Sequence, residues 1–222
     1  PSGKLAESFP RRLEQIPCFP YFGKQSNDIE YRESIFVGYR FYETYQVPVL
    51  FPFGHGLSYT HFTYSDLCLS SDTYKDGTLT VEFTVTNSGT LAGKEIVQLY
   101  VKNPVNQLLR SRIELRGFQK VFLQPGEGQK VTLELHERSF SYYNTQIELF
   151  DIPAGTYQIL IGASSKDIRL ESTVKVLSDS PIPDQQTLLK EYFDQLPKNH
   201  GLLPDSGLPI SQEQFQTLYG RP

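Results

Sequence analysis

The stretch LTVEFTV, residues 79–85, decides the fold class of this chain. Apolar and polar side chains alternate strictly along it, with Leu, Val and Phe on one parity and Thr and Glu on the other. Successive side chains of an extended strand point to opposite faces of a sheet, so the pattern predicts a strand with one buried and one solvated face. We expect the apolar parity, which includes Phe83, to face a core.

The same pattern recurs further along the chain. Residues 96–101 are apolar on both parities, which predicts a central strand that is buried on both faces. Turn residues separate the runs at 76–77, 87–89, 124–126 and 153–155. The other runs that keep one apolar parity are Val131, Leu133 and Leu135; Tyr157, Ile159 and Ile161; and Ile168, Leu170, Val174 and Val176.

About seven such strands with no helical pattern between them favour an antiparallel β-sandwich of the immunoglobulin or fibronectin type III kind. An antibody domain would need a core Trp and a bridging Cys pair, whereas this chain has no Trp and only two Cys. We therefore predict a mainly β protein whose sandwich, residues 62–178, is of the fibronectin type III-like variant.

The flanking segments have a different texture. Residues 1–50 are rich in Pro and aromatic side chains without regular periodicity, apart from a short helix expected over 34–45. Residues 51–61 interleave turn residues with rings, which predicts a connector pinned by aromatic packing. Residues 179–222 predict an amphipathic helical tail, with one helix beginning after Asp184 and a second capped at Ser211. We expect this tail to lie on a neighbouring body of the same protein; a partner-binding tail is the alternative.

Composition excludes several classes of function. The net charge is −4 and basic residues form no run, so the electrostatic footprint of a nucleic-acid-binding protein is absent from the sequence. No apolar run approaches the roughly 18 residues that cross a bilayer. Two cysteines, Cys18 and Cys68, are too few for a disulfide scaffold and favour a reducing, cytoplasmic compartment. The chain contains no Met and begins with Pro1, from which we expect a fragment of a longer protein.

Motifs for metal, nucleotide or triad chemistry are not found. The histidines, at positions 55, 61, 136 and 200, show no spacing that would place two ligands on one metal, and we predict neither a metal nor a cofactor. His55 lies near Ser58 in sequence, but the strained nucleophile turn of a hydrolase is missing. A linker histidine that makes a backbone hydrogen bond is the expectation.

One carboxylate cluster has the chemistry of a sugar site. Asp28, Glu30 and Glu33 lie among Tyr31 and Arg32, and rings that stack on a pyranose beside charged groups that bind hydroxyls are what such a site uses. A solvated acidic loop beside a packed interface explains the same residues equally well. The two alternatives remain open at this point.

Four stretches of the chain together resemble one enzyme family. They are PSGKL (1–5) with SFP (8–10), FVGYRFY (36–42), FPFGHGLSYT (51–60), and AGKEIVQLYV (92–101) with LRGFQKV (115–121). With these stretches the chain resembles the C-terminal part of glycoside hydrolase family 3, the β-glucosidases and β-xylosidases. The third stretch is the most specific, and the likeness covers roughly residues 1–176.

The resemblance implies a three-part enzyme. A barrel would carry an Asp nucleophile, an α/β sandwich domain would carry a Glu acid/base, and a fibronectin-like domain would follow. Residues 1–50 would then be the remnant of the α/β domain, and both catalytic residues would lie outside this chain. The implied partners are the remainder of the same polypeptide and, in the full enzyme, a β-linked glucoside or xyloside.

These inferences predict a C-terminal fragment of a retaining β-glycosidase that is inactive alone and borders the active site. Tyr31 and Glu33 are the candidate residues at the substrate entrance. One alternative is an autonomous carbohydrate-binding sandwich, which should show a flat strip of exposed aromatics; the other is a protein-interaction module. Rings such as Phe83 and Tyr157 share parity with aliphatic residues and are expected in the core instead.

Overall fold

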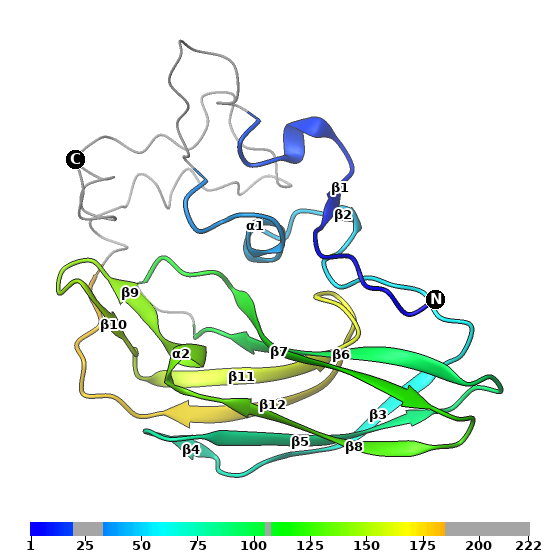
Figure 1. The fold of residues 1–222 in the computed structure, drawn as a ribbon. Coiled ribbons are helices and arrows are strands. Elements are labelled where there is room, and N and C mark those ends of the chain that lie inside the picture. Colours follow the sequence, from blue (N-terminus) through cyan, green and yellow to red (C-terminus); the bar gives the residue numbers. More distant parts are fainter. Residues whose placement is uncertain (20–32, 105–107, 185–222) are drawn as a thin grey trace.

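The computed structural model describes residues 1–19, 33–104 and 108–184. A β-sandwich forms the larger part, and a short leading segment lies against one of its faces (Figure 1). The leading segment contains β1 (Phe9–Pro10), the 3₁₀ helix η1 (Leu13–Gln15), α1 (Tyr39–Thr44) and β2 (Val49–Phe51). The sandwich contains β3 (Phe62–Leu69), β4 (Thr73–Tyr74), β5 (Leu79–Asn87), β6 (Gly93–Lys102), β7 (Ile113–Leu123), β8 (Gly128–Leu135), α2 (Glu137–Phe140), β9 (Tyr142–Asn144), β10 (Leu149–Asp151), β11 (Gly155–Gly162) and β12 (Ile168–Val176).

Two sheets face each other across the core. One has three strands in the order β3-β5-β8, and the other has five in the order β4-β12-β11-β6-β7. All pairings are antiparallel except that of the two-residue strand β4 with β12. The predicted mainly β fold of fibronectin type III-like kind is confirmed.

The core follows the predicted parity. Along β5 every second residue is buried, and Phe83 is 1% exposed. Tyr157 and Ile159 on β11 are fully buried in the same cluster. Strand β6 is buried on both parities from Val97 to Val101, as its continuous apolar run predicted. Its inner face meets the core, and its outer face is covered by the leading segment.

Aromatic packing joins the leading segment to the outer face of the five-stranded sheet. The Tyr39 ring of α1 stacks on Phe53 of the connector at 4.5 Å between centroids and meets Tyr100 of β6 edge-on at 6.3 Å. The backbone N–H of Leu115 on β7 donates to the Tyr39 hydroxyl at 2.8 Å. We call this docking surface, centred on Gln98 and Tyr100, the seat.

Buried polar groups reinforce the seat. The Gln98 side-chain amide donates to the backbone oxygens of Gly54 at 3.1 Å and Ala163 at 2.8 Å, while the Tyr100 hydroxyl donates to the Gln98 side-chain oxygen. Gly54 has a φ of +78°, and an added Cβ would lie 2.0 Å from that oxygen. Only glycine therefore fits this position of the connector.

Two ion pairs also fix the leading segment. The buried Glu43 of α1 accepts a hydrogen bond from the Ser165 hydroxyl at 2.8 Å and lies 2.7 Å from the Lys166 ammonium. Lys4 pairs with Glu95 at 2.8 Å and donates to the Ala163 backbone oxygen. The connector contacts the rest of the molecule through the Phe53 ring and through buried polar contacts that the sequence did not indicate.

Some local expectations change. The helix expected over 34–45 is limited to Tyr39–Thr44, because Gly38 precedes it with a φ of +58°. Helix α2 and the β9–β10 hairpin were not predicted, since elements of three or four residues are too short to show periodicity. The tail helices expected after Asp184 lie outside the described residues.

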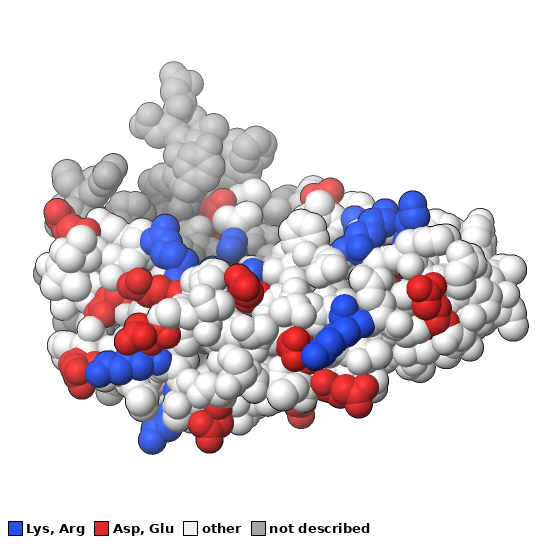
Figure 2. Space-filling model, turned by 60° about the horizontal axis from the view of Figure 1, so that its bottom comes forward, with Lys and Arg blue, Asp and Glu red and all other residues white. Residues whose placement is uncertain are grey.

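The surface carries both signs of charge. On the face shown in Figure 2, acidic and basic side chains are interspersed, without an extended basic area. Within the described parts of the chain, no helix is long and apolar enough to cross a bilayer.

Candidate functional site

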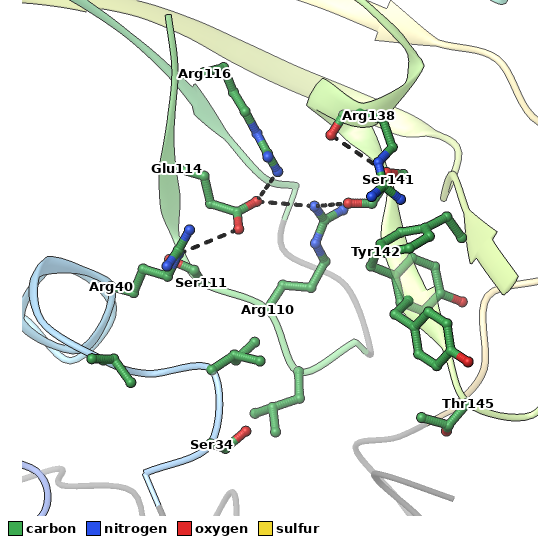
Figure 3. A pocket seen from close by; sticks show the side chains of 15 residues that line it. Ser34, Arg40, Arg110, Ser111, Glu114, Arg116, Arg138, Ser141, Tyr142 and Thr145 are labelled. Atoms are coloured by element: carbon green, nitrogen blue, oxygen red, sulfur yellow. Dashed lines mark hydrogen bonds and ion pairs between the residues drawn. The ribbon is translucent and has the colours of Figure 1, made fainter. Parts of the chain in front are cut away.

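A hollow of about 610 Å³ opens at one end of the sandwich, and three separate parts of the chain line it (Figure 3). Residues 34–40 approach from the leading segment, residues 109–116 from the start of β7, and residues 138–150 from α2 and the β9–β10 hairpin. Its volume falls within the range of ordinary small-molecule sites.

Charge is distributed unequally in this hollow. The described lining residues include four arginines, at positions 40, 110, 116 and 138, and one carboxylate, Glu114. The Glu114 carboxylate lies 2.6 Å from Arg116, 3.2 Å from Arg110 and 3.7 Å from Arg40 (Figure 3). The described lining therefore carries four positive charges against one negative charge, although the net charge of the chain is −4.

Arg110 is held firmly in place. Its guanidinium donates to the backbone oxygens of Phe140 at 2.9 Å and Ser141 at 3.0 Å, at the end of α2, and its side chain is 7% exposed. Asn103 fixes the same loop by donating to the Ser111 backbone oxygen at 2.6 Å. Arg110 thus joins β7 to the hairpin while its charge remains at the wall of the hollow.

Arg116 occupies a β-bulge. Leu99 pairs with Gly117 and Tyr100 with Leu115, so Arg116 is the extra residue in β7. Its Nε is buried and has no hydrogen-bond partner among the described residues. Burial lowers the pKa of the Arg116 guanidinium and the Glu114 charge opposes this shift; an arginine stays protonated in either case.

The hairpin supplies an aromatic wall. Tyr142, Tyr143 and Phe150 line the hollow, and the Arg138 guanidinium lies over the Phe150 ring at 3.4 Å from its centroid. Desolvation, together with the nearby Asp151 charge, raises the pKa of Tyr142 to about 12. Its hydroxyl is buried without a hydrogen-bond partner in the described structure.

Of the two candidate residues predicted from the sequence, the structure describes Glu33 but not Tyr31. Glu33 is half-buried and its backbone oxygen accepts from Phe36, while one of its carboxylate oxygens is buried without a hydrogen-bond partner in the described structure. The following residue, Ser34, lines the hollow. Tyr31 lies outside the described residues, as do Asp28 and Glu30.

The arginine cluster was missed by sequence reasoning, although a signal for it exists. In RSRIELR, residues 110–116, charged side chains occupy every second position, which on a strand gathers them on one side. The contributions of Arg40 and Arg138 depend on the tertiary fold and have no local signal.

His55 stacks its ring on Phe51 at 5.2 Å, and its backbone oxygen accepts a hydrogen bond from the backbone N–H of Leu5. Among the described residues no group of His, Cys, Asp and Glu is suited to a metal ion.

Exposed rings occur outside the hollow as well. On β7, Phe118 is 67% exposed and Phe122 is 52% exposed, with Lys120 between them on the same parity. These two exposed rings form a shorter apolar surface than the flat aromatic strip expected of a carbohydrate-binding module. The autonomous carbohydrate-binding module therefore stays an untested alternative.

Comparisons with known proteins agree with this architecture. A model of the fibronectin type III-like domain matches residues 95–165, which gives the class of the sandwich. Thermostable beta-glucosidase B of Acetivibrio thermocellus is 48% identical over 189 residues, covering 85% of this chain and 25% of that protein. An exo-alpha-(1->6)-L-arabinopyranosidase of Bifidobacterium breve is 39% identical over 181 residues, covering 81% of this chain and 23% of that protein.

Solved structures lead to the same family. Beta-glucosidase 3B from Thermotoga neapolitana, in complex with alpha-D-glucose, matches with a TM-score of 0.73 and 40% identity over 79% of this chain and 24% of that one. The GH3 beta-glucosidase of Bifidobacterium adolescentis matches with a TM-score of 0.77 and 34% identity over 84% of this chain and 29% of that one. The resemblance to glycoside hydrolase family 3 β-glucosidases is thereby confirmed. The chain spans about a quarter of the length of the curated relatives it matches.

Proposed function

We propose that this chain is a C-terminal fragment of a retaining β-glycosidase of the β-glucosidase type. In this proposal it stabilises and borders the active site but contributes no catalytic residue. The β-glucosidase relatives, about four times as long as the matched region, support the identity of the parent protein.

The observation that carries the structural role concerns the leading segment. Part of it is anchored on the seat, while other positions expose large apolar side chains among the described residues. Exposed apolar side chains gathered in one short segment are typical of a surface that another surface covers. The exposed apolar residues of residues 1–57 are Phe9, Leu13, Ile35, Val37, Leu50, Phe51 and Leu57.

The proposed covering surface is the remainder of the same polypeptide. We divide the chain into a remnant of the α/β domain (1–50), an aromatic connector (51–61), the fibronectin type III-like domain (62–178) and an amphipathic tail (179–222). The sandwich strands, which run from Phe62 to Val176, support the limits of the third part.

In the whole enzyme, a carboxylate would attack the anomeric carbon and a protonated carboxyl would release the aglycone. Neither group is assigned to this chain. The 222-residue chain should therefore fail to hydrolyse aryl β-glucosides. Turnover that disappears in a Glu33→Gln variant would show that the catalytic machinery is here.

The docking role is tested by Leu50→Gln, measured in two contexts. Leu50 is 61% exposed, so the substitution should leave the unfolding midpoint of the 222-residue chain unchanged. In the longer polypeptide, where Leu50 would be covered, it should cost about 1 to 3 kcal/mol. Leu177→Gln, at a 41% exposed position beyond β12, is the control and should have little effect in both contexts. Equal effects of Leu50→Gln in the two contexts would contradict docking at this surface.

Tyr31 and Glu33 are proposed to border the substrate entrance of the full enzyme. The acidic and aromatic composition of residues 28–33 supports this role. In the longer enzyme, Tyr31→Ala should lower kcat/KM for a disaccharide more than for an aryl glucoside, by about 1 kcal/mol or more, if its ring holds the leaving-group sugar. Equal losses on the two substrates would assign Tyr31 to packing.

A further inference from the structure

The arginine-lined hollow contains more positive charges than nearby carboxylates neutralise. Among the described lining residues, Glu114 neutralises one of four guanidinium charges, which leaves an excess of three. Asp151, whose charge acts on Tyr142, accepts hydrogen bonds from the neutral backbone N–H of Ile152 at 2.8 Å and the Asn144 side-chain amide at 3.4 Å. It keeps its negative charge but does not line the hollow, and counting it still leaves the described groups with an excess of positive charge. Like charges placed close together destabilise a fold unless a counter-charge is present, so this excess indicates a site for an anion.

Unused hydrogen-bonding groups lie in the same place. Arg116 Nε and the Tyr142 hydroxyl are both buried and unpartnered within the described structure, although buried polar groups are normally satisfied. The Arg138 guanidinium is aligned by its stacking on Phe150 and makes no ion pair with any described residue. Arg40 lies 3.7 Å from Glu114 and 5.6 Å from the centre of the Tyr39 ring, and its side chain is 41% exposed. Arg40 and Arg138 can therefore donate to a ligand without breaking a close ion pair, while the two buried donors show that the wall of the hollow is not fully satisfied internally.

The walls of the hollow are chemically different from one another. Figure 3 shows Arg40, Glu114 and Arg116 on one side of the hollow, and Arg138 on the other side, next to Tyr142. The C–H face of a pyranose is apolar and packs on aromatic rings, while an oxyanion on the same molecule would reach the arginine fork. Inorganic phosphate alone would fill little of a hollow of 610 Å³.

We propose that the hollow bounded by Arg40, Glu114 and Arg138 binds an anionic monosaccharide, a pyranose that carries a carboxylate or a phosphate. The oxyanion lies among Arg40, Arg116 and Arg138, and the sugar ring lies against Tyr142 and its hairpin neighbours. Glu114 positions the arginines and is too well paired to repel the ligand. This site is independent of the glycosidase chemistry proposed above, because it uses only residues of this chain and no catalytic group.

The test is isothermal titration calorimetry on the 222-residue chain with glucuronic acid, glucose 6-phosphate, inorganic phosphate and glucose. We expect at least one of the two anionic sugars to bind about tenfold or more tightly than both glucose and phosphate. Which of the two binds identifies the oxyanion as carboxylate or phosphate. The affinity should fall as salt is added, because the contacts are ionic.

Variants locate the binding. Arg138→Gln and Arg40→Gln change exposed side chains, so the fold should survive, and each should weaken the anionic sugar about tenfold. Arg112→Gln removes the same charge from an exposed position of the same segment that does not line the hollow, and it should change the affinity less than about twofold. The proposal is wrong if glucose binds as well as its anionic analogues, if phosphate binds as well as they do, or if the three variants behave alike.

Discussion

The core of the sandwich and the seat of the leading segment are both buried, but they are built from different materials. The core consists of aliphatic and aromatic side chains supplied by alternate positions of the strands. At the seat, Gln98 bonds Gly54 and is itself bonded by Tyr100, while Glu43 of the docked helix α1 bonds Ser165, 122 positions away. Apolar burial stabilises without direction, whereas a buried hydrogen bond also specifies position. The core thus holds the sandwich together, and the seat determines where the leading segment lies.

The largest effect should come from the core. Phe83 is enclosed in the sandwich core. Phe83→Ala removes the ring and leaves a cavity that the neighbouring side chains cannot fill, which should cost about 3 to 5 kcal/mol of unfolding free energy. Chemical denaturation measures this loss. Thr84→Ala, on the opposite face of β5, is the matched control and should cost much less. A loss below about 1 kcal/mol at Phe83 would contradict the packing described here.

The next effect concerns the seat alone. Glu43→Ala would leave the buried Ser165 hydroxyl without its acceptor, which should cost about 1 to 3 kcal/mol. Hydrogen exchange should show faster opening of α1, while β5 in the core keeps its protection. Lys166→Ala is the control and should cost less, because the Lys166 side chain is 45% exposed. Equal loss of protection in α1 and β5 would mean that the two regions unfold as one.

Alkaline pH should also act on the seat. Burial raises the pKa of Tyr42 in α1 to about 12, and burial raises the pKa of Tyr100 as well. The unfolded chain releases these protons near pH 10, so the stabilisation is complete below about pH 10 and is lost as pH rises through the folded pKa. Between about pH 10 and 12, Tyr42→Phe should reduce the steepness of this loss by up to about 1.4 kcal/mol per pH unit. Urea unfolding at several pH values, with tyrosinate absorbance recorded, measures it; an unchanged slope would mean that Tyr42 ionises in the folded protein.

The smallest effect should occur at acidic pH on the surface of the sandwich. The hydrogen bond from Arg169, at the start of β12, lowers the pKa of the Asp167 carboxyl. This contribution is present above the unfolded pKa near 4 and is lost as pH falls through the lower folded pKa. Both side chains are over two-fifths exposed, so Asp167→Asn should cost less than about 1 kcal/mol at neutral pH. A larger loss, measured by thermal unfolding, would mean that solvent screens this pair less than its exposure implies.

The difference between core and seat also explains what the sequence could predict. Strict alternation in residues 79–85 identifies the buried face of β5 because that information is local. Apolar residues on both parities of 96–101, with Gln98 as the one polar member, predicted that the outer face of β6 is covered, without indicating by what. The contact of Glu43 with Ser165 spans 122 positions, and nothing in either neighbourhood indicates it.

The arginine-lined hollow could be predicted from the sequence only in part. Arg110, Glu114 and Arg116 are separated by even numbers of positions, so a strand would place them on one face. The sequence does not predict the bulge at Arg116. Arg138 enters through a helix of four residues that no periodicity indicates. A site assembled from three segments is visible only after the fold has brought them together.

The long contacts of the seat also constrain the order of events during synthesis. Lys4 and Glu43 are made early, but the groups they bind, Ala163 and Ser165, follow 159 and 122 positions later. At about 5 to 20 residues per second, a ribosome needs several seconds or more to reach them. During that interval the leading segment lacks its partners in the sandwich. The turn after β11 is therefore the part of the sandwich that completes the docking of the leading segment.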